Sequence, residues 1–129
     1  MTAPPLPDGV HWLRWDAESV QAIAERDRPV LMFVADPLDP LLPFHKAIFN
    51  AIPKNEKLRA LLRGTFPALF LEKPEVPEEI GVFGAGERYH LAILSPYGFN
   101  PLVTFDPTRG TPDEVANEIA RVLEAMAKV

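Results

Sequence analysis

The feature that most constrains the fold is an uninterrupted apolar run, Val30–Ala35, which follows Pro29. A short apolar run without alternation is typical of a central strand that is covered on both faces. The next residues, Asp36–Pro40 (DPLDP), have the composition of a turn. From about Leu41 the apolar spacing becomes helical, and Pro43 is tolerated only in the first turn of a helix. The stretch therefore predicts an interior strand, a tight turn and an amphipathic helix.

The spacing of apolar residues predicts which face of this helix is buried. One face collects five apolar side chains, at Phe44, Ala47, Ile48, Ala51 and Ile52. Residues three and four apart lie on the same side of a helix, so we expect this face to pack on the sheet. His45 follows Phe44, and we expect it on the surface of the same helix.

The flanking segments extend this unit into an α/β pattern. Strands are predicted at His11–Trp15, Phe66–Leu71, Tyr89–Ser95 and Leu102–Asp106. One helix is predicted to follow the cap Asp16, and another to run from the cap Asn55 to Gly64. A last helix is predicted to start at a capping box formed by Thr111 and Glu114. The apolar stripes are Val20, Ile23 and Ala24, then Leu58, Leu61 and Leu62, and finally Val115, Ile119, Val122, Leu123 and Met126.

The order of these elements predicts one mixed sheet. The first half should pair in parallel through right-handed crossovers, and the last two strands should form an antiparallel hairpin. Helices on both faces would make a three-layer α/β/α sandwich. We expect residues 1–10 to be an extended lead-in and residues 11–129 to form a single domain. Residues 73–87 are predicted to be a connection, with one helical turn over residues 77–83.

Composition excludes several functional classes. The chain has 129 residues, a net charge of −5 and no cysteine. Basic residues are isolated, which argues against a nucleic-acid groove. Without cysteine there is no thiolate nucleophile, disulfide or thiolate metal site. The first residues lack a signal-peptide pattern, and no apolar stretch approaches the roughly 20 residues that span a bilayer. We therefore expect a cytoplasmic protein that binds no membrane.

The element order, with an apolar strand that runs into a proline-containing turn and a helix, resembles the thioredoxin superfamily. The resemblance covers Trp12 to Met126, nearly the whole chain. In an alignment from Pro29, the two cysteines of the family's C-x-x-C motif fall on Asp39 and Leu42, and its buried carboxylate falls on Phe33. The family's cis-proline falls on His90, or on Tyr89 if the strand carries one extra residue. All four chemical positions depart from the family pattern.

The resemblance implies a thioredoxin-like fold without thiol chemistry. Thiol–disulfide exchange requires a thiolate that attacks sulfur, and Asp39 cannot replace it. What the resemblance leaves is the surface near the former active site, which contacts extended polypeptide in this family. Function does not follow from the fold alone.

Three polar residues are candidates for other chemistry. Asp36 and Asp39 flank Pro37-Leu38, and the thioredoxin-like arrangement would let His90 face them. The Asp–His pair offers a general base, and the two aspartates with His45 or His90 offer part of a metal site. Turn and cap preferences already account for both aspartates, however, and an Asp–His pair is more often a structural contact. The three histidines show no metal-ligand spacing. We predict no metal and no cofactor.

Apolar residues in and beside the turns are candidates for a binding surface. They are Leu38, Leu41, Leu42, Tyr89, Tyr97 and Phe99, with Phe83 in the preceding connection. A contiguous exposed group would mark an interface. The alternative is that Leu41, Leu42 and Phe83 fold back on the core.

Two functional classes follow. The first is a redox-inactive thioredoxin-like domain that binds a protein partner or a second copy of itself. The second is a small non-thiol enzyme or metal-binding protein that uses Asp36, Asp39 and His90. A purely structural subunit of a larger assembly is a third possibility, which the sequence does not separate from the first.

Overall fold

The structure is a computed structural model that describes residues 10, 12–35, 40, 42–72, 91–96 and 100–127. Its elements follow the predicted order. They are β1 (Trp12–Leu13), α1 (Ala17–Arg26), β2 (Val30–Ala35), α2 (Leu42–Ala51), the 3₁₀ helix η1 (Ile52–Lys54), α3 (Glu56–Gly64), β3 (Ala68–Glu72), β4 (Leu91–Leu94), β5 (Pro101–Thr104) and α4 (Pro112–Ala127). The helical turn predicted over residues 77–83 lies outside the described residues.

The strands form one five-stranded mixed sheet in the order β1-β3-β2-β4-β5. The strand β2 lies at its centre, parallel to β3 and antiparallel to β4. At one edge β1 is parallel to β3, and at the other edge β5 is antiparallel to β4. The predicted interior strand and the predicted division into a parallel half and an antiparallel hairpin are both confirmed.

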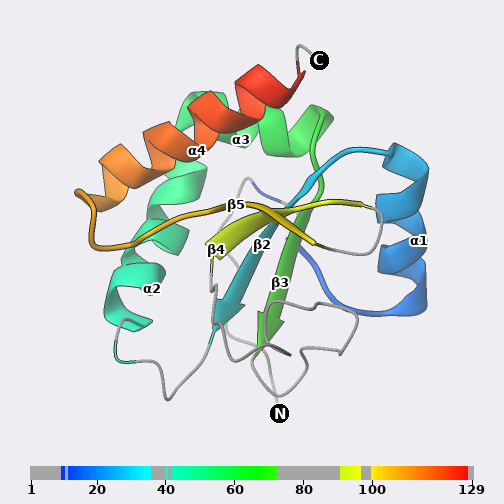
Figure 1. The fold of residues 1–129 in the computed structure, drawn as a ribbon, viewed down its shortest axis with the longest axis horizontal. Helices are drawn as coiled ribbons and strands as arrows, with labels where there is room; N and C mark the ends of the chain where they lie inside the picture. The colour runs from blue at the N-terminus through cyan, green and yellow to red at the C-terminus, as the bar shows by residue number, and fades with distance from the viewer. Residues whose placement is uncertain are drawn as a thin grey trace.

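Helices cover both faces of this sheet (Figure 1). Alternate residues of β2 point to opposite faces, so Leu31 and Phe33 join one buried cluster while Met32 and Val34 join the other. The first cluster includes side chains of α2, α3 and α4, and the second includes Ile23 of α1. Because both faces are covered, β2 needs no polar residue, which explains its continuous apolar run.

The predicted caps set the starts of three helices. The Asp16 carboxylate accepts a hydrogen bond from the Ser19 N–H at 2.7 Å, at the start of α1. The Asn55 side-chain oxygen accepts from the Leu58 N–H at 3.0 Å, at the start of α3. Each cap satisfies a backbone donor that lacks a partner within its helix.

The capping box of α4 is also present. The Glu114 carboxylate accepts from the Thr111 N–H at 3.0 Å, and the Thr111 hydroxyl accepts from the Glu114 N–H at 3.2 Å. The predicted apolar face of α4 is confirmed: Val115, Ile119 and Leu123 are buried, while Val122 and Met126 pack against them.

The predicted face of α2 is wrong by about one residue. Ile48, Ala51 and Ile52 are buried as expected, but Phe44 is 50% exposed and His45 is only 3% exposed. The buried face follows His45, Ile48, Phe49 and Ile52, which are spaced three and four residues apart, and Phe44 lies beside it. The expectation that His45 lies on the surface is therefore incorrect.

The edge strand β5 is irregular. The pairing of β4 with β5 shifts register between Ile93 and Leu94, and β5 starts at Pro101, which has no N–H to donate. Bulges and prolines are common at sheet edges, where they hinder pairing with another chain. Leu102, at this irregularity, is 51% exposed.

None of the described helices combines the length and the apolar character required to cross a membrane.

Candidate functional site

The topology brings several strand ends to one edge of the sheet. Since β4 is antiparallel to both of its neighbours, β5 runs in the same direction as β2 and β3. The carboxyl ends of β2, β3 and β5 therefore lie at the edge where β4 begins, which we call the carboxyl edge. In Figure 1 the arrowheads of β2 and β3 point to this edge, and α2 starts beside it. Ligand sites of α/β sheets usually lie outside the carboxyl ends of the strands.

An aromatic cluster fills the α2 face of the sheet near this edge. Phe33 is 1% exposed, and its ring centroid lies 4.6 Å from that of Phe49 and 5.8 Å from that of Phe70. Trp12 packs on Phe49 at 4.9 Å. The Arg14 guanidinium lies over the ring of Phe70, 5.1 Å from its centroid, as in a cation–π contact. The first turn of α2 contacts this cluster through His45, which packs against Phe33.

His45 is the buried polar residue of that first turn. Its imidazole faces the Phe33 ring edge-on, with centroids 6.4 Å apart and planes at 71°. The His45 side chain is buried, and it makes a further interaction besides this ring contact. The first turn of α2 is therefore held to the sheet by a specific side chain.

Asp106 follows β5 at the same edge. The Phe105 N–H donates to the Leu91 carbonyl at 3.0 Å, and Leu91 is paired with Phe33. Asp106 is the residue after Phe105, so it lies close to the end of β2 that contains Phe33. The Asp106 carboxylate is exposed and accepts from the Thr108 hydroxyl at 2.6 Å and from the Thr108 N–H at 2.9 Å.

The surroundings of Asp106 favour its charged form. The two hydrogen bonds from Thr108 are the main reason that the pKa of Asp106 lies below its ordinary value, and the electrostatic effects of Arg109 and His45 act in the same direction. The carboxyl edge therefore carries an exposed carboxylate that accepts two hydrogen bonds from Thr108.

The exposed side of α2 at this edge is apolar. Leu42 is half-buried, whereas Pro43 and Phe44 are exposed. An aromatic ring that is held in solvent by a rigid helix is a common anchor of protein interfaces. Among the described residues of the carboxyl edge, Phe44 is the large apolar side chain most open to contact.

Most of the predicted site residues lie outside the described residues. This is so for the acid–base candidates Asp36, Asp39 and His90. It is also so for Leu38, Leu41, Phe83, Tyr89, Tyr97 and Phe99 among the apolar candidates. Leu42 is the exception, and it lies at the start of α2.

The prediction that His90 faces the Asp36–Asp39 turn is not tested. Leu91, the residue after His90, pairs with Phe33 of β2, and β2 ends at the residue before Asp36.

The sequence reasoning missed three residues of the carboxyl edge. Phe44 was assigned to the core, His45 to the surface, and Asp106 to the end of a strand. The available signal was the apolar stripe formed by Ile48, Phe49 and Ile52, which places His45 on the buried side of α2 and Phe44 beside it. For Asp106 the signal was Thr108 two residues later, since aspartate often accepts hydrogen bonds from this position in a turn.

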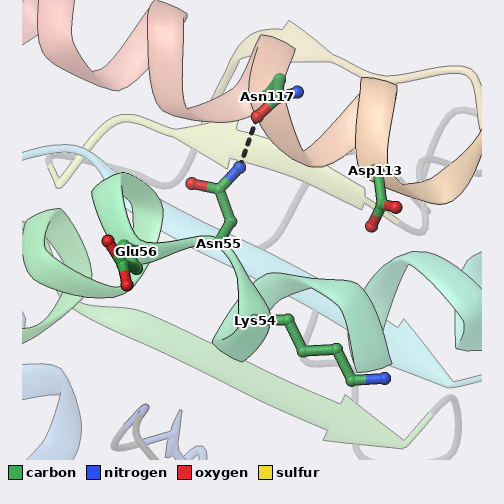
Figure 2. A pocket seen from close by; sticks show the side chains of 5 residues that line it. All are labelled: Lys54, Asn55, Glu56, Asp113 and Asn117. Atoms are coloured by element: carbon green, nitrogen blue, oxygen red, sulfur yellow. Dashed lines mark hydrogen bonds between the residues drawn. The ribbon is translucent and has the colours of Figure 1, made fainter.

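A polar groove of about 520 Å³ lies away from this edge, between the start of α3 and α4. It is lined by Lys54, Asn55, Glu56, Asp113 and Asn117. The Asn55 side-chain amide donates to the Asn117 side-chain oxygen at 2.6 Å, which links the two helices (Figure 2). In Figure 2, Lys54 and Glu56 point away from this pair. The groove therefore lacks a convergent set of polar groups.

No set of three or more potential metal-ligating side chains occurs within the described segments. The chain matches no protein-family model and no curated protein sequence.

Proposed function

We propose that this protein is a redox-inactive, thioredoxin-like domain that acts by binding protein at its carboxyl edge. The observation that carries the proposal is the exposed Phe44 in the first turn of α2, next to His45, which contacts Phe33 near the end of β2. Rigid aromatic side chains bury a large area with little loss of conformational entropy, which suits them to anchor a partner.

The thioredoxin-like part of the proposal is supported by the topology. The resemblance implies a parallel βαβ first half, an antiparallel ββα second half and helices on both faces. The strand order β1-β3-β2-β4-β5 and the directions of the strands agree with this arrangement. The cytoplasmic location stays a prediction from the sequence.

The absence of thiol chemistry is supported by two features. The chain has no cysteine, so no mixed disulfide with a substrate can form. The position at which the resemblance implies a buried carboxylate holds Phe33, whose ring packs against both Phe49 and Phe70. We expect the purified protein to show no disulfide reductase turnover, and measurable turnover would overturn this part of the proposal.

The binding part is tested by replacing the anchor. Phe44→Asp puts a charge at a position that is already half exposed, so the fold should be retained, whereas burial of that charge in an interface is unfavourable. Sedimentation velocity over a range of concentrations tests self-association of the wild-type and variant chains. A partner other than a second copy is tested by affinity capture with both chains. Glu25→Ala on the exposed surface of α1 is the matched control.

The proposal predicts that Phe44→Asp weakens association and that Glu25→Ala does not. The proposal would be contradicted if the wild-type chain stayed monomeric at high concentration and captured no protein whose binding is lost in Phe44→Asp. The rival prediction of acid–base or metal chemistry at Asp36, Asp39 and His90 is tested separately. If Asp39→Ala and His90→Ala leave ligand and metal binding unchanged, that prediction loses its basis.

A further inference from the structure

We draw no further inference here: the strongest candidate, the polar groove between the start of α3 and α4, is built on a helix N-terminus that Asn55 already caps, and nothing else in the described residues points to a ligand for it.

Discussion

His45 packs edge-on against Phe33, with ring centroids 6.4 Å apart. This contact joins the first turn of α2 to the central strand, and it does so at the edge where β2 ends. Since Phe44 precedes His45, burial of the imidazole fixes the direction in which the neighbouring phenyl ring points. The proposed anchor is thus held in place by the residue next to it.

Removal of the imidazole should destabilise the protein. His45→Ala leaves a cavity beside Phe33 and removes the ring contact between the imidazole and Phe33. We expect a loss of about 2 kcal/mol or more in the free energy of unfolding, measured by urea denaturation. Lys46→Ala, at the exposed next position, should change it by less than about 0.5 kcal/mol. Equal effects of the two substitutions would show that His45 has no special packing role.

The two functions of the Asn55 side chain can be separated. Asn55→Asp keeps an oxygen that accepts from the Leu58 N–H, but it removes the amide that donates to Asn117. Asn55→Ala removes both interactions and should cost about 1 kcal/mol of unfolding free energy through loss of the cap. We expect Asn55→Asp to lie closer to the wild type in thermal unfolding. An alanine variant as stable as the wild type would show that the cap contributes nothing.

The pKa of Asp106 predicts how stability depends on pH. Hydrogen bonds from Thr108 lower this pKa from its ordinary value of 3.8, so the folded state favours the charged carboxylate. The resulting stabilisation is fully present above the unfolded value and is lost as pH falls through the lower folded value. Asp106→Asn keeps an acceptor but does not ionise. The difference in unfolding free energy between the wild type and this variant should shrink on acidification below the ordinary value. A difference that does not change with pH would contradict the assignment.

The end of α1 offers a stabilising substitution. Asp27 has φ of 54° in the left-handed region, where its N–H donates to the carbonyls of Ala24 and Ile23. Glycine adopts this conformation without the steric cost that a side chain brings. Asp27→Gly should therefore raise the free energy of unfolding by a few tenths of a kcal/mol, up to about 1 kcal/mol. Asp27→Val should lower it, because a β-branched side chain is strained at this φ. The reverse order in chemical denaturation would refute this explanation.

The fold could be predicted largely because the decisive signals are local. The run Val30–Ala35 identified the central strand, and Asp16, Asn55 and Thr111 identified three helix starts from side chains that bond only three residues away. The order of strands within the sheet depends on contacts between distant segments. Such contacts leave no periodic pattern in a single sequence.

The candidate site was less predictable because a helical stripe is broad. Ile48 and Ile52 are compatible with a buried face that includes Phe44 and with one that includes His45. Hydrophobicity alone favours the phenylalanine. The structure favours the histidine, since its ring fits edge-on against Phe33.

Site-specific photo-crosslinking from position 44 tests the central claim most directly. A photoreactive phenylalanine analogue replaces Phe44 in one chain and Glu25, on the exposed surface of α1, in another. The account predicts an adduct of defined mass from position 44 and not from position 25. An adduct formed by the purified chain alone would identify a second copy as the partner. Absence of an adduct at position 44, or the same adducts from both positions, would contradict a binding surface at the carboxyl edge.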